Sequence, residues 1–444
     1  MSKIFKAYDI RGVFPDELDA GDAYAIGRGT ASFFGADTLV IGRDARASSP
    51  ELVEALIRGV RDEGVAVIDI GLVATPMLYF AVDSLGAGGG IMLTASHNPA
   101  EYNGFKICRE HAIPVGEVSG LVDIERLSQE RKDAAPADRP GELTHQDVLA
   151  GYVDHVLAVG QERPALHVAI DCGNGMAGVA LGAVLERLSL RTERLYFEPD
   201  CTFPNHPADP LQVENLADVV AMVKKTGADF GVAFDGDADR AIFVDDTGSP
   251  VSSDLVTALL ARSQLLRHPG GRVLYDLRSS WVTPEEIEAA GGSAGICRVG
   301  HSFVKAAMRE EDAIFAGELS GHFYFRFSPT LFADDGIAAL VALLDLLGRE
   351  GKPFSELVAP LRRYHASGEI SRRVADPAAI LDDVESKHAS ASEVSRLDGL
   401  LVRYDDWWFN LRPSNTEPLL RLNVEARSQE RMETERDRLL EVMV

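Results

Sequence analysis

The stretch from which the fold can be worked out is Ile91-Met92-Leu93-Thr94-Ala95-Ser96-His97-Asn98-Pro99. Its apolar first part is typical of a buried strand, and Pro99 restrains both its own backbone and that of Asn98, so the strand is expected to end in a rigid loop. Ser96 is expected near the crest of this loop. A serine hydroxyl is a weak nucleophile, and covalent chemistry there needs a base, a metal ion or a phosphate already attached. Taken alone, such a loop is more often a hydrogen-bonded surface turn than a catalytic one.

The order of apolar strand, polar loop and helix occurs at three other places in the chain. Residues 39–42, 168–170 and 273–275 are short apolar runs, and a polar loop and a helix-forming segment follow each of them. An amphipathic helix is predicted over residues 20–34. Repeats about one domain length apart predict α/β units of similar plan, with their loops gathered at the carboxyl ends of the strands.

Three segments of loose composition mark the expected domain boundaries. Residues 134–141 are rich in proline and small residues, residues 246–250 form a turn, and Gly351-Lys352-Pro353 follows a core helix predicted over residues 335–347. The expected fold class is α/β, with three similar mixed α/β domains and a smaller C-terminal α+β domain. The predicted limits of these domains are residues 1–143, 144–248, 249–360 and 361–444.

Composition restricts the classes of function. The chain has 444 residues, 46% of them hydrophobic, and a net charge of −25, which disfavours affinity for nucleic acid or for an anionic membrane surface. Anionic small molecules require a local cluster of positive residues. The four cysteines lie far apart in the sequence and indicate neither a disulfide framework nor a metal cluster. Without a signal peptide or a run of about 20 apolar residues, the protein is expected in the cytoplasm.

The strongest chemical signal is Phe230-Gly231-Val232-Ala233-Phe234-Asp235-Gly236-Asp237-Ala238-Asp239-Arg240. An apolar strand here leads to three carboxylates at alternate positions, a density of negative charge that is tolerable if the group is solvated or holds a cation. Hard oxygen ligands point to magnesium. A calcium EF-hand loop does not fit, because Arg240 and Asp246 stand where that loop needs Gly and Glu. Arg240 fits better as a charge partner for a phosphate, and a solvated acidic turn is the alternative.

Three further loops carry polar groups. Gly317-Glu318-Leu319-Ser320-Gly321-His322 offers a carboxylate, a hydroxyl and an imidazole that suit sugar hydroxyls, although a tight turn fits almost as well. Arg412-Pro413-Ser414-Asn415-Thr416-Glu417-Pro418 offers a guanidinium, hydroxyls, an amide and backbone N–H groups that could cradle a phosphate, or it is a solvated loop. His301 follows another strand, where a lone histidine is more often structural.

Taken together, the four loops that contain Ser96, Asp235, Glu318 and Arg412 resemble those of the α-D-phosphohexomutase superfamily, most closely its phosphomannomutase/phosphoglucomutase branch. The order along the chain also matches, starting with Tyr8-Asp9-Ile10-Arg11-Gly12. The resemblance covers the whole chain and implies four domains around a central cleft. It further implies that Ser96 is carried as phosphoserine and that Mg²⁺ is bound by this phosphate and by Asp235, Asp237 and Asp239.

The resemblance implies a mutase that interconverts hexose 1-phosphate and hexose 6-phosphate, of mannose, glucose or both. The phosphoserine donates its phosphoryl group, and hexose 1,6-bisphosphate is the intermediate and activator. Lys106 matches the family position nearest the reacting phosphate, and the other candidates for the general acid or base are Arg11, His301 and His322. The catalytic candidates are Ser96, Lys106, Arg11, His97, Arg240 and His322. The substrate-binding candidates are Tyr8, Arg278, His301, Glu318, Ser320, His322, Arg412, Ser414, Asn415 and Thr416. The expected partners are sugar phosphates, and the protein is expected to be a monomer or a homodimer.

Some residues depart from the family pattern. Arg278 stands where many relatives carry a lysine, Leu319 where Met or His is frequent, and Ala238 where Gly is frequent. These departures leave the preferred hexose open, and phosphoglucosamine mutase is one alternative. A second is a haloacid-dehalogenase-type phosphatase with Asp235 as nucleophile, and a third is a non-catalytic sugar-phosphate sensor. The phosphatase alternative leaves Ser96 without a role.

Overall fold

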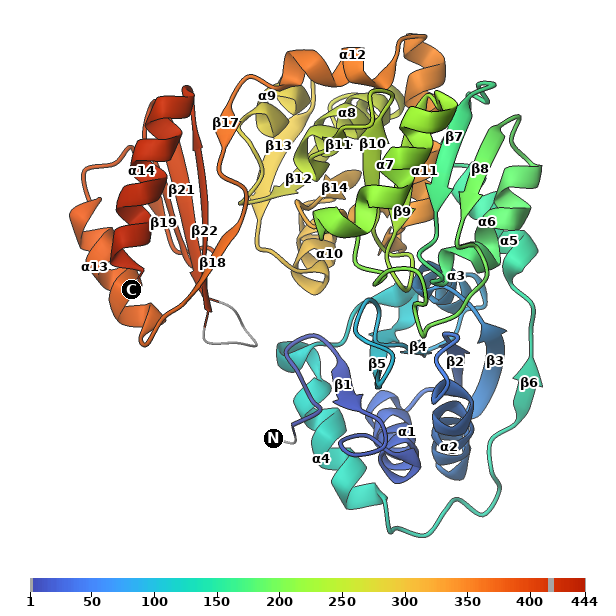
Figure 1. Cartoon of the computed structure of the whole chain (residues 1–444). Helices are drawn as coiled ribbons and strands as arrows, with labels where there is room; N and C mark the ends of the chain where they lie inside the picture. The colour runs from blue at the N-terminus through green and yellow to red at the C-terminus, as the bar shows by residue number, and fades with distance from the viewer. Residues whose placement is uncertain (1–2, 414–418, 444) are drawn as a thin grey trace. The chain divides into compact units, whose positions relative to one another are not determined.

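The computed structural model describes residues 3–413 and 419–443 (Figure 1). The chain divides into two compact units, and both are discontinuous in sequence. The first unit comprises Met1–Ser252 and Ser320–Ser355, and the second comprises Ser253–Leu319 and Glu356–Val444.

The first sheet of the first unit carries the Ser96 loop, which we define as residues 94–99. Its strand order is β1-β5-β4-β2-β3-β6, with β2 parallel to β3 and β4, and with β5 antiparallel to β4. Helix α1 packs against α2 and α4, and α3 packs against β2 and β4 (Figure 1). The bounds are β1 (Ile10–Val13), α1 (Ala20–Phe34), β2 (Thr38–Arg43), α2 (Ser49–Asp62), β3 (Ala66–Leu72), α3 (Thr75–Ser84), β4 (Gly89–Leu93), β5 (Tyr102–Arg109), α4 (Leu121–Arg131) and β6 (Leu143–His145).

The helix predicted over residues 20–34 is confirmed, and local sequence signals fix both of its ends. Asp19 caps the first turn of α1, because its side chain accepts a hydrogen bond from the Asp22 N–H. The Asp22 side chain in turn accepts one from the Asp19 N–H. Gly35 ends the helix with a left-handed φ of 55°, a conformation that glycine adopts without steric cost.

The second sheet of the first unit carries residues 235–240, which we call the metal loop. Its strand order is β11-β10-β9-β7-β8, with β7 parallel to its neighbours β8 and β9. The metal loop joins the antiparallel strands β9 and β10, and β9 coincides with the predicted apolar strand over residues 230–234. The bounds are α5 (Leu149–Leu157), β7 (His167–Asp171), α6 (Ala177–Glu186), β8 (Arg191–Leu195), α7 (Ala217–Thr226), β9 (Phe230–Phe234), β10 (Ala241–Asp245) and β11 (Pro250–Val251).

A later segment of the chain completes the first unit. Strands β15 (Phe323–Arg326) and β16 (Phe332–Asp334) form an antiparallel pair, and α11 (Gly336–Glu350) packs against α5 and β10. Asp335 caps α11, because its carboxylate accepts the Ala338 N–H at 2.8 Å. The core helix predicted over residues 335–347 is therefore confirmed.

The second unit combines a parallel α/β part with a C-terminal antiparallel sheet. Strand β12 is parallel to β13 and β14, and the C-terminal sheet has the order β17-β22-β21-β20-β19, with β18 also paired to β22. The bounds are α8 (Ser253–Arg267), β12 (Arg272–Asp276), α9 (Val282–Ala289), β13 (Ser293–Cys297), α10 (His301–Glu310), β14 (Phe315–Gly317), α12 (Phe354–Val358), β17 (His365–Ala366), β18 (Ile370–Arg373), α13 (Pro377–Lys387), β19 (Glu393–Ser395), β20 (Leu400–Arg403), β21 (Trp407–Pro413), β22 (Leu419–Ala426) and α14 (Gln429–Val442). The chain thus contains three mixed α/β domains and a C-terminal domain with an antiparallel sheet, which confirms the predicted α/β class.

All four cysteines are buried thiols. Burial raises the pKa of Cys201 to about 12 and raises the pKa of Cys172 and Cys297 above the usual range. Among the helices in the described part of the chain, none is long and apolar enough to cross a lipid bilayer.

Candidate active site

Ser96 lies directly after β4 in a fixed position. Its backbone has a left-handed φ of 50°, and its N–H donates to Thr94 Oγ1 at 3.0 Å. The Ser96 hydroxyl donates to Asp235 Oδ2 at 2.9 Å and lies 3.2 Å from His97 Nδ1. The residue is only 3% exposed, so it is not part of a solvated surface turn. The fold therefore holds this hydroxyl between a carboxylate and an imidazole.

Arg46 clamps the Ser96 loop from the end of β2. Its side chain is fully buried and donates to the backbone carbonyls of Ser96 at 2.8 Å and Asn98 at 2.7 Å. It also donates to the carbonyls of Pro99 at 2.7 Å and Tyr102 at 2.9 Å. Of these four carbonyls, that of Pro99 also accepts the Tyr102 N–H at 3.0 Å. One guanidinium thus fixes the shape of the loop that carries the serine.

The metal loop gathers three buried carboxylates next to the serine. One carboxylate oxygen each from Asp235, Asp237 and Asp239 lies within 4.8 Å of the other two. Gly236 allows the two loops to approach, because a Cβ there would lie 2.2 Å from the Ser96 carbonyl oxygen. Burial and the nearby Asp239 raise the pKa of Asp235 well above its usual value.

This donor set fits a hard divalent cation. In the described residues, the buried Oδ1 atom of Asp237 has no hydrogen-bond partner, and an unpaired buried carboxylate oxygen is costly. Three carboxylates with no histidine or cysteine among them favour Mg²⁺ over the softer metals. Asp239 also belongs to a second group with His322 and Asp334, in which the ligand atoms lie within 4.8 Å of one another.

Positive groups balance the metal loop. Lys106 Nζ, from β5, lies 2.6 Å from carboxylate oxygens of both Asp237 and Asp239. Burial alone would lower the pKa of Lys106, but the two aspartates raise it above its usual range, so the amine is charged at neutral pH. Arg240 donates through Nε to Asp235 at 3.1 Å and through its backbone N–H at 3.2 Å.

His97 is a neutral imidazole beside the serine. Its Nδ1 atom accepts a hydrogen bond from Arg240 Nη2, and Ser96 Oγ is the other polar neighbour of this atom. Burial, Arg240 and Arg11 lower the pKa of His97 well below its usual value. Arg11 donates to the Ala95 carbonyl at 3.3 Å and to the Asn98 side chain, so it too is anchored on the Ser96 loop.

Ser320 and His322 belong to the first unit and contact the metal loop. His322 Nε2 lies 3.4 Å from Asp239 Oδ1, and its Nδ1 atom is hydrogen-bonded to Ser320 Oγ at 2.9 Å. An antiparallel bridge between Arg240 and His322 fixes the two backbones, and the Ala241 N–H donates to the Gly321 carbonyl at 3.0 Å. The Ser96 loop, the metal loop and this histidine therefore form one site.

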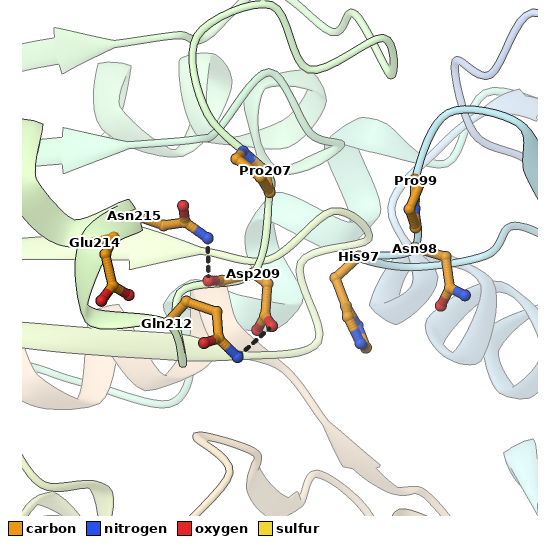
Figure 2. A pocket seen from close by; sticks show the side chains of 8 residues that line it. All are labelled: His97, Asn98, Pro99, Pro207, Asp209, Gln212, Glu214 and Asn215. Atoms are coloured by element: carbon orange, nitrogen blue, oxygen red, sulfur yellow. Dashed lines mark hydrogen bonds between the residues drawn. The ribbon is translucent and has the colours of Figure 1, made fainter. Parts of the chain in front are cut away.

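A polar pocket of about 420 Å³ opens beside the Ser96 loop. Figure 2 shows His97, Asn98 and Pro99 on one side, facing a wall that carries Asp209 and its neighbours. Asn215 Nδ2 donates to the Asp209 carbonyl at 2.8 Å, and the Asp209 carboxylate lies 3.8 Å from Arg240 Nη1. The full lining is His97, Asn98, Pro99, Pro207, Asp209, Gln212, Glu214 and Asn215.

The second unit holds another group of the predicted residues. The Arg278 side chain donates twice to Asp276 at the end of β12, at 2.6 Å and 3.3 Å. Asp276 also accepts the Arg278 N–H at 2.7 Å and the Leu319 N–H at 2.8 Å. Glu318 is 1% exposed and accepts the Gly300 N–H at 2.7 Å. His301 is the first residue of α10, directly after Gly300.

One expectation for the phosphate-binding segment is wrong, and the others stay predictions. Arg412 was expected in a loop, but it lies within β21, where its backbone pairs with β22. The predicted residues Ser414, Asn415 and Thr416 lie outside the described residues. Tyr8 lies in a bend just before β1.

Sequence reasoning missed several residues that shape these sites. Thr75 donates to Asp237 Oδ2 at 2.6 Å, and its position at the start of α3, after β3, was the available signal. Arg46 lies in the polar loop that follows the apolar run of residues 39–42, and this loop carries no motif that marks it. Glu369, which contacts Arg278, and Arg421, which contacts Glu369, lie in no recognisable motif.

Comparisons with known proteins cover the whole chain. Four phosphoglucomutase/phosphomannomutase domain models match in order, with alpha/beta/alpha domain I at residues 2–132 and domain II at residues 150–248. Domain III matches residues 252–364, and the C-terminal domain matches residues 369–442.

Relatives and solved structures agree with this match. A phosphomannomutase of Salmonella montevideo is 41% identical over 95% of this chain and 94% of its own length. A phosphoglucomutase of Neisseria gonorrhoeae is 37% identical over 99% of this chain and 96% of its own.

Among solved structures, a phosphoglucomutase/phosphomannomutase family protein from Burkholderia thailandensis has a TM-score of 0.91 at 34% identity, covering 100% of this chain and 97% of that one. The fold is also shared with an Aspergillus fumigatus N-acetylphosphoglucosamine mutase in complex with GlcNAc-6P and magnesium, at a TM-score of 0.66 and 16% identity over 99% of this chain and 95% of that one. The chain therefore belongs to the phosphoglucomutase/phosphomannomutase family of the α-D-phosphohexomutase superfamily.

Proposed function

We propose that this phosphohexose mutase interconverts the 1-phosphate and 6-phosphate of mannose, glucose or both, with Ser96 as carrier of the phosphoryl group. The observation that supports this role is the buried Ser96 hydroxyl, held 2.9 Å from Asp235 at the edge of three carboxylates. A phosphate on this hydroxyl would lie beside the three carboxylates and near the cationic side chains of Lys106, Arg11 and Arg240, which contact these carboxylates or the Ser96 loop. Phosphoryl transfer depends mainly on such positioning and charge stabilisation.

In the proposed reaction a sugar hydroxyl attacks phosphorus while the bond from Ser96 Oγ to phosphorus breaks. The sugar hydroxyl loses its proton, and Ser96 Oγ gains one. Arg240 stabilises the charge on the transferring group, and His97, whose Nδ1 atom accepts from Arg240 Nη2, holds that guanidinium beside Ser96. Lys106 is charged and acts as a hydrogen-bond donor. The candidates for the acid or base at the sugar hydroxyl are Lys106, Arg11, His301 and His322.

We further propose that Asp235, Asp237 and Asp239, together with the phosphate on Ser96, hold Mg²⁺. When bound, this cation supplies charge stabilisation for the phosphoryl oxygens. The support is the all-oxygen donor set, the unpaired Oδ1 atom of Asp237 and the magnesium present with a relative of the same fold.

The substrate residues divide by chemistry. We assign the phosphate that does not react to Arg278 and Arg412, with Ser414, Asn415 and Thr416, and the ring hydroxyls to Glu318 and Ser320. Tyr8, His301 and His322 complete the predicted binding set. The intermediate, hexose 1,6-bisphosphate, reverses its orientation before its other phosphate returns to Ser96, and added bisphosphate acts as the activator. A cytoplasmic location and a monomeric or dimeric state stay predictions from the sequence.

The test is phosphorus NMR of the purified protein with mannose 1-phosphate or glucose 1-phosphate, Mg²⁺ and a trace of hexose bisphosphate. We expect the 6-phosphate to appear without free phosphate, and the relative rates to identify the hexose. Free phosphate would contradict the proposal and support the phosphatase alternative. If the protein converts only glucosamine phosphate, the substrate is that sugar phosphate and not the phosphate of mannose or glucose.

Ser96→Ala is expected to abolish turnover and to prevent the formation of an acid-stable phosphoenzyme. Its circular dichroism spectrum should match that of the wild type. Ser84→Ala, at the exposed end of α3, is the control and should keep both. Near-normal turnover in Ser96→Ala would remove Ser96 as the carrier.

A further inference from the structure

Glu369 of the second unit lies among three guanidinium groups. Its Oε2 atom is 3.3 Å from Arg278 Nη1 and 3.6 Å from Arg412 Nη2, and its Oε1 atom is 3.2 Å from Arg421 Nη1. We call Arg278, Arg412 and Arg421 the arginine cluster. Two of these arginines were candidates for binding phosphate, whereas Arg421 and Glu369 had no assigned role.

Strand pairing forces two of the arginines together. Arg412 on β21 and Arg421 on β22 are direct partners in the antiparallel register. Like charges opposite each other destabilise a sheet, so this arrangement needs a compensating anion. Glu369, together with Asp276 on Arg278, supplies two negative charges for three positive ones, which leaves an excess of one positive charge in a protein of net charge −25.

Burial increases the need for a further anion. The side chains of Arg278 and Arg412 are 7% and 8% exposed, whereas that of Arg421 is 29% exposed and can be reached from solvent. Within the described part of the chain, the buried Nε atoms of Arg412 and Arg421 have no hydrogen-bond partner. Burial and the nearby Arg278 lower the pKa of Arg412, and Arg421 adds to this effect.

We propose that Arg421 is a further phosphate-binding residue and that Glu369 is the positioning residue that holds it beside Arg278 and Arg412. The ligand class is a phosphate, whose negative charge offsets the positive excess of the arginine cluster and whose oxygens accept from guanidinium groups. The identification of this anion as the non-reacting phosphate of a hexose phosphate rests on the proposed function.

The positioning role of Glu369 predicts a change in phosphate affinity opposite to the change that a simple charge effect predicts. Glu369→Gln removes a negative charge from an anion site, and electrostatics alone would then strengthen phosphate binding. If Glu369 positions the guanidiniums, its loss lets Arg412 and Arg421 move apart, and binding weakens. The direction of the change therefore separates the two roles.

The experiment compares the wild type with Arg421→Leu, Arg421→Lys and Glu369→Gln. For Arg421→Leu we expect the KM for hexose 1-phosphate to rise about tenfold, because a charge-assisted hydrogen bond to the substrate is lost, while kcat changes less than about threefold. Arg421→Lys should restore part of the affinity, and Glu369→Gln should raise KM by a similar factor. Arg372→Leu, which removes an exposed charge from β18, is the matched control and should leave KM unchanged.

A second readout does not depend on turnover. Calorimetric titration of glucose 6-phosphate and of inorganic phosphate into each variant, in a Ser96→Ala background, gives dissociation constants without reaction. If the wild type lacks mutase activity but Arg421→Leu weakens phosphate binding, the proposed function fails and this proposal stands. Unchanged binding in Arg421→Leu, or tighter binding in Glu369→Gln, would overturn the proposal. Arg421→Lys keeps the test valid if the leucine variant does not fold.

Discussion

At the scale of single residues, Asp237 is the side chain whose replacement should separate cation binding from folding. Asp237→Asn keeps the size of the side chain but removes a charge from the group that would hold Mg²⁺. We expect the midpoint of a magnesium titration, followed by the thermal shift of the protein, to rise at least about tenfold. Turnover should fall together with cation affinity.

The control for this prediction is Asp154→Asn, because Asp154 is 70% exposed on α5 and pairs with Arg187. It should leave the magnesium midpoint unchanged. An unchanged midpoint in Asp237→Asn itself would mean that the aspartate serves only to hold Lys106 and Thr75.

At the scale of elements, the Ser96 loop depends on Arg46. Arg46→Met should destabilise the protein by about 3–5 kcal/mol, because a buried charge partner of Asp44 is lost and four backbone carbonyls lose their hydrogen bonds from the Arg46 guanidinium. Urea unfolding measures the loss, and proteolysis within residues 94–102 should accelerate. Arg58→Met, an exposed change on α2, should show neither effect.

The same loop shows which parts of the structure the sequence can predict. Helix α1 and strand β9 were predicted with correct bounds because their signals are local, namely a capping aspartate, a terminal glycine and an apolar run. The four loops could be identified because each carries its chemistry in consecutive residues. The clamp by Arg46 could not, since its partners lie 50 to 56 residues later in the chain.

The arginine cluster illustrates the same limit. Glu369 lies 91 residues from Arg278 and 52 residues from Arg421 in the sequence. The pairing of β18 with β22 and of β22 with β21 brings Glu369, Arg412 and Arg421 together, and Arg278 joins them from the end of β12. Their residue types are ordinary for exposed strands, so no local pattern marks them. Strand register, which is fixed by tertiary structure, decides this part of the site.

At the scale of the whole molecule, the first unit needs a segment from far along the chain. A fragment of residues 1–252 would lack α11, whose buried Leu340 and Leu343 belong to a helix that packs on α5 and β10. We expect this fragment to bind hydrophobic dyes and to unfold without a sharp transition, because its apolar faces are left uncovered. Calorimetry of the fragment beside the intact chain provides the test, and a sharp transition would contradict it.

Stability of the first unit should also depend on pH through His155. Its ring packs against Phe80 and Phe327, with ring centroids 4.9 Å and 4.1 Å away, and burial lowers its pKa to about 4. The unfolded chain therefore binds a proton near pH 6.5, whereas the folded chain does not. This contribution is complete above pH 6.5 and is lost as the pH falls towards 4.

By pH 5 the loss should reach about 2 kcal/mol relative to pH 7.5. Urea unfolding of the wild type and of His155→Gln at both pH values measures the difference between their pH dependences. His145→Gln, in which the changed side chain is 72% exposed, is the control and should follow the wild type. Parallel pH profiles of His155→Gln and the wild type would show that His155 does not contribute.

The buried thiols have a practical consequence for observing motion in this enzyme. Cys172 follows β7 in the first unit, and Cys297 ends β13 in the second, so each unit contains an alkylation target that solvent cannot reach while the unit is closed. Since the reactive species is the thiolate, and burial disfavours it, modification by iodoacetamide requires local opening. Peptide mapping of the alkylated sites over time would then show in which unit the thiol is modified first. The same measurement with sugar phosphate would show in which unit the substrate slows local opening.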